Sequence, residues 1–491
     1  MLNRLAILAK LLGLCCLGSL AGPQLRANAS ADWDAGFLFD NYPLTLELGQ
    51  RVEALGPLLY RQERDSECTL AVSPLFSRTK DPVIEAEEFD FVYPLLTFDR
   101  FGREYRWQLL QLLSFSGGQN QNEVMRHRFT MFPFYFQQRS ADPTQNYTAL
   151  LPIYGRIKQR LFRDEIFFVM FPFYSQTRKR DVVTDNYLYP FFHLRRGEEL
   201  RGWQFWPLVG QEHKGVTAKT NGFGETEVIG GHDKFFALWP IYFNSALAIG
   251  TENPQKEFGI LPLYNSVRSP NRDSTGVLWP FFTWIDDREK KYREWEGPWP
   301  LVVVARGEGK TTTRFLPFFS RASNTNLVSN SYLWPVYKYN RIQSSPLVRE
   351  RTRILFFLFS AVNEKNTETG AAHERTDFWP LFTHRRDFNG NTRLQLLAPI
   401  EPILPNNKSV ERNWSPLWSV WRAEKNPKTG NTSQSLLWNL YRRETSPASK
   451  KCSLLFGLFK YQSDAKAKHW RVFYLPLTKS QKDSEHVSEH R

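Results

Sequence analysis

Apolar and polar positions follow one another along this chain in blocks of about twenty residues. An aromatic residue or leucine, a proline, an apolar residue and a second aromatic recur throughout, as in LWPVYKYN at residues 333–340. Copies of this motif centre on Pro74, Pro94, Pro133, Pro152, Pro172, Pro190, Pro207, Pro240, Pro262, Pro280, Pro300, Pro317, Pro335, Pro380, Pro399, Pro416 and Pro476. Copies without the proline surround Phe357, Asn439 and Gly457, and weaker ones lie at Leu113 and Pro57. A fixed period over most of the chain predicts a repeat architecture.

Turn residues lie midway between successive motifs. Asn389-Gly390 lies between Pro380 and Pro399, and similar stretches are Gly197–Glu199, Pro270–Asp273 and Gly307–Gly309. Asn-Gly and glycine provide the positive φ angles that tight hairpins need. Each unit is therefore predicted to be one strand of about 10 to 13 residues with its proline near the middle, giving an all-β, antiparallel up-and-down meander of about 20–22 strands. A parallel solenoid is the rival, but it does not require a turn at the midpoint.

Such a long sheet favours closure into a large β-barrel, because open sheets rarely exceed about ten strands and closure removes exposed edges. The apolar centre of each motif, however, covers only about 16 Å, whereas a transmembrane barrel needs an apolar band of about 25 Å. A soluble propeller, sandwich or solenoid therefore remains an alternative. A proline in every strand predicts a bulge at a common height, with bends at Pro280 and Pro335.

The first residues have the pattern of an export signal. Arg4 and Lys10 flank a short apolar stretch that continues to Ala21, and small residues precede possible cleavage after Ala21 or Ala29. A membrane anchor is the alternative, but the apolar run falls short of about twenty residues. Lipidation at Cys15 is a further alternative, although Leu14 stands where a small residue is expected. The predicted organisation is a signal peptide at 1–29, a lead-in at 30–56, a single β-repeat domain at 57–478 and a polar tail at 479–491.

After cleavage, only Cys68 and Cys452 remain. Two cysteines in a large exported chain do not form a disulfide framework. Separate thiols are therefore favoured over a bridge that would tie the first strands to the last.

Composition narrows the class of protein. Apolar residues make up 41% and aromatic residues 15%, which is too apolar for a disordered chain. The net charge of +14 is spread along the whole length, which argues against a nucleic-acid-binding tail. Basic residues cluster where motifs meet turns, as in Arg195-Arg196 and Arg178–Arg180, where they suit anionic lipid head groups or simply solvated turns.

Motifs for catalysis or metal binding are weak. Val302–Thr311 resembles a phosphate-binding loop, but Val304 replaces the first glycine and no helix is expected to follow, so a hairpin turn is favoured. The acidic pairs Asp286-Asp287 and Glu198-Glu199 fall at expected turns. None of the histidines has zinc-site spacing, except that His486 and His490 would suit a metal if the tail were helical; they are His127, His193, His213, His232, His373, His384, His469, His486 and His490.

The recurrent aromatics could form a platform for sugars or single-stranded nucleic acid, but packing explains them first. The sequence therefore predicts no catalytic, cofactor-binding or metal site, no cofactor, and no nucleic-acid partner.

The leading functional hypothesis is a non-enzymatic bacterial envelope protein of the outer membrane, acting as a channel or as a structural or interaction scaffold. Outer-membrane lipid or lipopolysaccharide is its expected partner. A soluble periplasmic or secreted β-repeat protein that binds a ligand or partner is the second hypothesis, and a carbohydrate-active enzyme on the same scaffold is the third.

Overall fold

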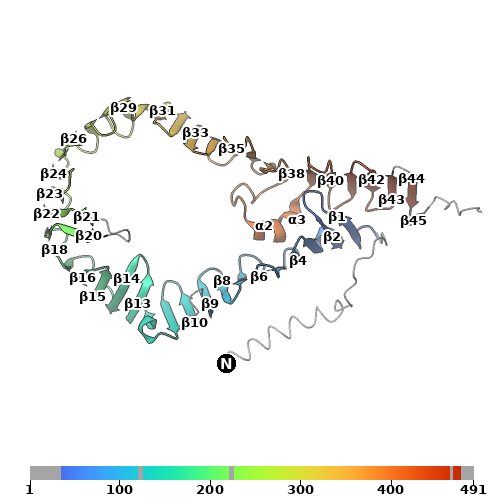
Figure 1. The fold of residues 1–491 in the computed structure, drawn as a ribbon, viewed down its shortest axis with the longest axis horizontal. Coiled ribbons are helices and arrows are strands. Elements are labelled where there is room, and N and C mark those ends of the chain that lie inside the picture. The colour runs from blue at the N-terminus through green and yellow to red at the C-terminus, as the bar shows by residue number, and fades with distance from the viewer. Residues whose placement is uncertain (1–34, 120–124, 221–225, 465–467, 477–491) are drawn as a thin grey trace, which may run out of the picture. The chain divides into compact units, whose positions relative to one another are not determined.

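The computed structural model describes residues 35–119, 125–220, 226–464 and 468–476. The expected signal peptide at 1–29 with Cys15, and the tail at 479–491 with His486 and His490, lie outside these residues. The described chain is almost entirely antiparallel sheet, with 43 strands in one sheet. Each strand pairs with the next one along the chain, except that β19 pairs with β22 (Figure 1). The predicted all-β up-and-down meander is confirmed, and the parallel solenoid is wrong.

The strands are short. The first nineteen are β1 (Asp40–Pro43), β2 (Gly49–Ala54), β3 (Leu59–Arg64), β4 (Glu67–Val72), β5 (Phe76–Asp81), β6 (Ala86–Phe91), β7 (Leu96–Phe101), β8 (Glu104–Leu109), β9 (Leu113–Gln119), β10 (Met125–Met131), β11 (Tyr135–Ser140), β12 (Tyr147–Leu150), β13 (Tyr154–Arg160), β14 (Arg163–Val169), β15 (Tyr174–Lys179), β16 (Val182–Tyr187), β17 (Phe192–Arg196), β18 (Leu200–Phe205) and β19 (Val209–Lys214).

The same pattern continues to the end of the sheet. The later strands are β22 (Gly231–Ala237), β23 (Tyr242–Ile249), β24 (Gln255–Ile260), β25 (Tyr264–Arg268), β26 (Arg272–Val277), β27 (Phe282–Asp287), β28 (Tyr292–Glu296), β29 (Val302–Gly307), β30 (Thr311–Phe315), β31 (Phe319–Ser323), β32 (Leu327–Tyr332), β33 (Tyr337–Ser344), β34 (Leu347–Ile354), β35 (Phe359–Asn366), β36 (Ala372–Phe378), β37 (Phe382–Arg386), β38 (Thr392–Leu396), β39 (Trp421–Lys425), β40 (Thr432–Leu436), β41 (Tyr441–Thr445), β42 (Ser449–Leu454), β43 (Phe459–Asp464), β44 (Lys468–Val472) and β45 (Leu475–Pro476).

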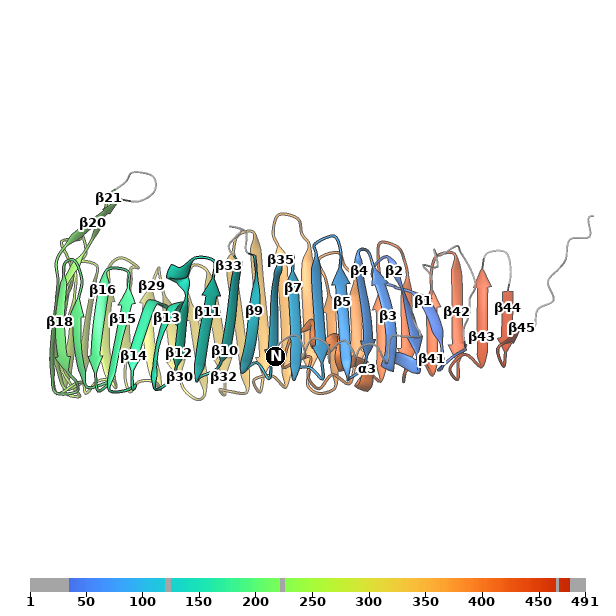
Figure 2. The same ribbon diagram turned by 90° about the horizontal axis from the view of Figure 1, so that it is seen from below.

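A few elements lie outside this sheet. They are the hairpin β20 (Thr217–Thr220) and β21 (Thr226–Ile229), the 3-10 turns η1 (Gly56–Leu58) and η2 (Pro143–Gln145), and the helices α2 (Lys408–Asn413) and α3 (Ser415–Trp418). The hairpin projects beyond the ends of the neighbouring strands (Figure 2). No helix in the described part of the chain has the length and apolar character needed to cross a membrane.

One sequence repeat corresponds to two strands. The prediction of about 20–22 strands, each with a proline at its centre, is therefore wrong in strand count and in the position of the proline. The prolines lie in tight turns: Pro280 lies between β26 and β27, and Pro335 lies between β32 and β33. The predicted mid-strand bends at these two residues do not exist. Aromatic neighbours made the motif look like the middle of a strand, since the same residue types favour strands.

The proline turns are bonded to one another by the backbone. Tyr189 N–H donates to the carbonyl of Pro172, and Trp239 N–H donates to that of Pro207, at 2.7 and 2.6 Å. The Trp279–Pro280 and Trp334–Pro335 peptide bonds are cis. Because proline lacks an N–H, a turn is the place where it costs the sheet no ladder bond, while its carbonyl still accepts one. The turns therefore continue the ladder from repeat to repeat.

The turns at the other ends of the strands are the predicted polar ones. Asn389-Gly390 connects β37 to β38, and Gly390 has a φ of +84°. Gly197–Glu199 connects β17 to β18, and Glu308 and Gly309 lie between β29 and β30. Since the strands alternate in direction, the turns of the proline motif lie along one side of the sheet, and the polar turns, two of which contain Pro270 and Pro346, lie along the opposite side. We call this row of proline-type turns, which lies along the ends of the strands and not along an outermost strand, the apolar edge.

The two faces of the sheet differ in chemistry. The residues that flank each proline turn pair across neighbouring strands, as in Tyr174 with Tyr187 and Tyr187 with Phe192. Side chains alternate along a strand, so the adjacent residues Ser175 and Asn186 point to the opposite face. We call these the aromatic face and the polar face.

Side-chain hydrogen bonds between neighbouring strands run across the polar face. Asn186 Nδ2 donates to Ser175 Oγ at 3.1 Å, and Thr69 Oγ1 lies 3.0 Å from Thr79 Oγ1. An apolar cluster interrupts this face at β11–β14, and its members are Phe136, Tyr147, Ala149, Ile157 and Phe168. Cross-strand pairs of this kind are the main source of sheet stability.

The predicted closure of the barrel by a strand ladder is not found among the described strands. The first strand, β1, pairs with β2, and the last strand, β45, pairs with β44. Side-chain contacts join the N-terminal strands to the C-terminal strands instead. Asn439 Nδ2, for example, donates to Glu53 Oε2 at 2.7 Å. Cys68 in β4 and Cys452 in β42 are both free, which confirms the interpretation as separate thiols.

Candidate functional site

The motifs considered for catalysis lie apart from one another. Val302–Gly307 is β29 and pairs antiparallel with β30, so the predicted hairpin turn is confirmed, and Lys310 in that turn lies 2.6 Å from Glu294. Asp286 and Asp287 end β27, whereas Glu198 and Glu199 occupy a turn. Within residues 35–119, 125–220, 226–464 and 468–476, no group of three or more histidine, cysteine or acidic side chains is placed to hold a metal ion.

The described histidines lie on separate strands or loops. His193 is buried on the polar face and contacts Asn186 and the carbonyl of Pro190. His232 lies 2.7 Å from Glu212, and burial lowers its pKa below the usual value. Both histidines therefore belong to the polar face of the sheet.

The apolar edge is the most extensive exposed apolar feature among the described residues. The residues just after the prolines protrude from it: Phe134 is 54% exposed, Phe173 is 60% exposed and Phe281 is 52% exposed. Tryptophans precede several of the prolines, and Trp239 and Trp334 are about half exposed. A contiguous exposed apolar surface of this length marks an interaction site.

Apolar character continues from this edge onto the aromatic face and then ends. In β33 the side chains on this face are Tyr337, Tyr339 and Arg341 in order from the edge. In β17 they are Phe192, Leu194 and Arg196. In these two strands the aromatic face is therefore apolar for two rows and charged from the third row onward, whereas in other strands the second row is already polar or charged, as with Arg78 in β5, Gln137 in β11 and Arg156 in β13.

The third row on this face is basic in most strands that leave a proline turn. Its basic members are Lys80, Arg100, Arg139, Lys158, Arg178, Arg196, Arg268, Arg306, Arg341, Arg386 and Lys425. Some have acidic neighbours, as Arg341 has Glu350 at 3.6 Å. We call this set the basic row.

A second notable region lies where a long insertion interrupts the apolar edge. The turn that begins at Pro399 does not lead directly into the next strand but runs through α2 and α3 to β39. We call this segment, residues 397–420, the plug. Of the two motif copies in it, Pro399 lies near the start of an edge turn and Pro416 lies inside α3, so the prediction of a strand centred on Pro416 is wrong.

The plug is bound to the N-terminal strands. Arg412 lies 2.5 Å from Glu88 and 3.3 Å from Asp90, while Tyr60 donates its hydroxyl to the Arg412 carbonyl at 3.0 Å. Asn413 Nδ2 donates to Asp90 at 2.9 Å. These partners come from β3 and β6, more than three hundred residues earlier in the chain.

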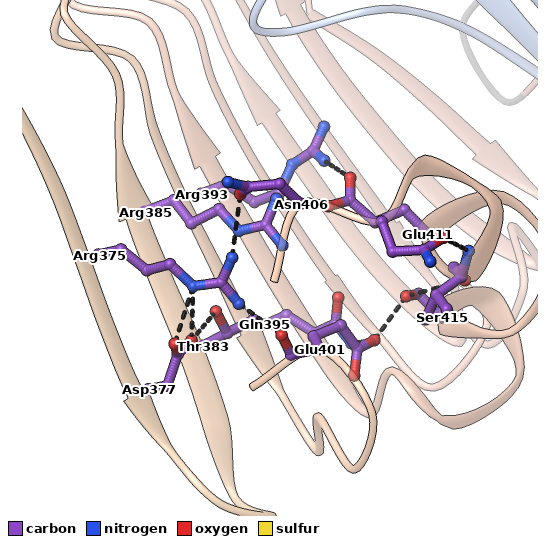
Figure 3. A network of polar contacts seen from close by, with 12 residues as sticks. Arg375, Asp377, Thr383, Arg385, Arg393, Gln395, Glu401, Asn406, Glu411 and Ser415 are labelled. Atoms are coloured by element: carbon purple, nitrogen blue, oxygen red, sulfur yellow. Dashed lines mark hydrogen bonds and ion pairs between the residues drawn. The ribbon is translucent and has the colours of Figure 1, made fainter. Parts of the chain in front are cut away.

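The plug is also bound to the C-terminal strands (Figure 3). Arg375 lies 2.8 Å from Asp377 and donates to the carbonyl of Glu401 at 2.6 Å. The carboxylate of Glu401 accepts from Gln395 at 2.7 Å and from Ser415 at 2.5 Å. The plug therefore connects β36–β38 to β3–β6, which no strand ladder joins directly.

Acidic and basic side chains in and beside the plug stabilise each other's charged forms. Burial alone would raise the pKa of Glu411, but Arg385 and Arg393 outweigh it and lower that pKa below the usual value. For Glu424, burial is likewise outweighed by Arg393 and Arg422, which lower the pKa. Both carboxylates are therefore ionised when the plug is bound.

Acid is expected to loosen the plug. A carboxyl whose pKa is lowered by folding stabilises the fold above its unfolded pKa, about 4.5, and this stabilisation is lost as the pH falls through the folded value. A titration from about pH 7 to about pH 3, followed by the fluorescence of Trp414 and Trp418, should show a transition below about pH 4.5. In Glu411→Gln this transition should be smaller, and an acid profile identical to that of the unmodified protein would contradict the assignment.

Sequence reasoning missed the plug, and it found the basic row only in part, as the clusters at Arg195-Arg196 and Arg178–Arg180. The helix α2 had a signal, because Asn407 accepts a hydrogen bond from Val410 N–H and so acts as an N-cap before KSVERN. The basic row can also be recognised in the sequence, but only after the boundaries of the strands are placed correctly. Comparison with models of known protein families and with curated proteins finds no match to this chain.

Proposed function

We propose that this chain is a non-enzymatic bacterial envelope protein, a structural or interaction scaffold that lies on a membrane through its apolar edge. The observation that carries the proposal is the repeated apolar turn, with Phe134, Phe173 and Phe281 more than half exposed. A soluble sheet gains nothing from placing apolar residues in all turns of one edge, since turns are normally polar. A lipid surface makes the same arrangement favourable.

The depth of the apolar layer fits a membrane interface. It comprises the turn, the first row of side chains and, in strands such as β17 and β33, a second row, so it reaches at most three residues, or about 10 Å, from the turn. Interfacial proteins bury their apolar surface about 5–10 Å into the boundary between head groups and acyl chains. Tryptophan and tyrosine prefer this depth because one end of each ring system is apolar and the other can form a hydrogen bond.

Insertion from one side is favoured over a channel that spans the bilayer. The longest strands, such as β33 and β34, have eight residues. A tilted transmembrane strand needs about 9–11 residues. The channel form of the initial hypothesis therefore has less support than the scaffold form.

Charge supports an anionic membrane. The basic row lies directly above the apolar layer, at the depth of the head groups, and the whole chain carries a net charge of +14. Each Lys or Arg near an anionic surface adds about 1 kcal/mol of attraction, which falls with salt. Export to the outer membrane, with its lipid or lipopolysaccharide as the partner, is part of the same proposal.

Flotation with lipid vesicles tests the proposal. The purified protein should float with phosphatidylcholine vesicles and should float more completely when phosphatidylglycerol is added, with part of that gain lost in high salt. Protein that stays at the bottom of the gradient with both vesicle types would refute membrane association.

A further inference from the structure

A cavity of about 110 Å³ lies between the N-terminal and C-terminal strands, next to the plug. Its walls come from the polar faces of β2–β3 and β38–β41, and they include Arg51, Arg393, Arg422 and Arg442. About 10–15 Å³ of such space holds one water molecule, so this cavity has room for an anion of several atoms.

Positive charge exceeds negative charge in the lining. Arg51, Arg64, Arg393, Arg422 and Arg442 face Glu47, Glu53 and Glu424, which leaves two positive charges. Three of the arginines have an acidic partner within the lining: Arg51 lies 2.7 Å from Glu53, Arg64 lies 2.9 Å from Glu47, and Arg393 lies 3.0 Å from Glu424. Arg442 pairs with Glu444, which does not line the cavity.

Two guanidinium groups in the lining have donor groups that are not used within the described residues. Arg51 is only 7% exposed, and its Nη2 is buried without a hydrogen-bond partner. Arg422 takes part in none of the side-chain hydrogen bonds or ion pairs formed within the described residues, and burial together with Arg393 lowers its pKa. A buried donor without a partner destabilises the fold, more so when it is charged, and an anion in the cavity would remove this destabilisation.

We propose that this cavity binds a phosphate group. Phosphate has the two charges that balance the lining, and guanidinium groups form bidentate hydrogen bonds with its oxygens. Tyr42, whose ring lies 3.2 Å from Arg442 Cζ, and the hydroxyls of Ser433 and Ser435 add polar wall.

The phosphate site would give the proposed membrane scaffold a specific lipid ligand, and this part of the inference rests on the proposed function. Pro57, Pro416, Trp438 and Asn439 also line the cavity, and they belong to turns or helices at the apolar edge. The lining extends from these turns to Glu47 and Arg64 beside the polar turns, so it crosses the level of the basic row, and a phosphate held at that level would lie at the depth of lipid head groups. A phosphomonoester lipid is the expected carrier, and inorganic phosphate shares its chemistry.

Calorimetry with inorganic phosphate tests the site without any membrane. The unmodified protein should bind phosphate, and both Arg422→Gln and Ser435→Asp should weaken binding about tenfold or more, because one removes a positive charge and the other adds a negative one. Arg293→Gln is the matched control, since its side chain is 84% exposed in β28, outside the cavity lining. Absence of phosphate binding, or equal binding by Arg422→Gln, would overturn the proposal.

Vesicles then identify the carrier. Flotation should be stronger with mixed phosphatidylcholine and phosphatidic acid than with phosphatidylcholine alone, and Arg422→Gln should lose most of this preference. If phosphate binds but phosphatidic acid gives no preference, the site is a phosphate site whose ligand is free in solution. If the protein binds phosphate and floats with no vesicle, the membrane scaffold is wrong and the phosphate site stands.

Discussion

Replacement of Phe134, Phe173 and Phe281 by glutamine in one variant is expected to reduce vesicle binding about a hundredfold. Complete burial of a large apolar side chain is worth about 1.5–3 kcal/mol, so side chains that are half exposed should each contribute about 1 kcal/mol on insertion. Three such losses amount to about 3 kcal/mol, and 1.4 kcal/mol is a factor of ten in binding. Flotation at increasing lipid concentration measures the change.

The matched control replaces exposed apolar residues at the opposite edge. Val216, Leu327 and Leu347 lie beside the polar turns and are 48%, 37% and 43% exposed. Their triple glutamine variant should bind vesicles like the unmodified protein, because this edge points away from the lipid. Equal losses in both triple variants would contradict a role specific to the apolar edge, and thermal unfolding of each variant shows that the fold is retained.

The repeat could be predicted from the sequence, but its phase could not. The period, the antiparallel order and the polar turns at Asn389-Gly390 and Gly307–Gly309 follow from spacing and turn chemistry. The proline turns were assigned to strand centres because Trp, Phe and Tyr favour strands, while turns are expected to be polar. That expectation fails at the apolar edge, where the turns are rich in aromatic residues and proline, so the pattern placed Pro280 and Pro335 in strands.

The plug and the cavity depend on contacts that spacing cannot reveal. Arg412 and Asp90 are separated by 322 residues, and nothing in the sequence around either residue indicates that the two are in contact. Arg422 is one basic residue among many until the ladder places it on the polar face opposite Arg51. The plug and the cavity can therefore be recognised only when distant strands are placed side by side. The apolar edge can be recognised as soon as the strand boundaries are known.

Loss of the Arg412 side chain is expected to release the plug while most of the meander persists. Its side chain is 12% exposed and that of Asp90 is 5% exposed. Removing one member of a buried ion pair costs about 3–5 kcal/mol, because it leaves the other charge without its partner. In a repeat protein each strand depends mainly on its neighbours, so the ladders far from the plug should be unaffected. Hydrogen exchange of Arg412→Met should show α2 amides at least about a hundredfold less protected.

A double-mutant cycle separates the ion pair from general disruption of the helix. Asp90→Asn combined with Arg412→Met should cost less than the sum of the two single changes, since the partners share one interaction. Arg293→Gln, which breaks an exposed contact with Asp286 at 3.6 Å, should change exchange little, because surface pairs are worth at most about 1 kcal/mol. Additive effects of Asp90→Asn and Arg412→Met would mean that the plug is held by its other contacts, among them those of Tyr60, Trp414 and Glu401.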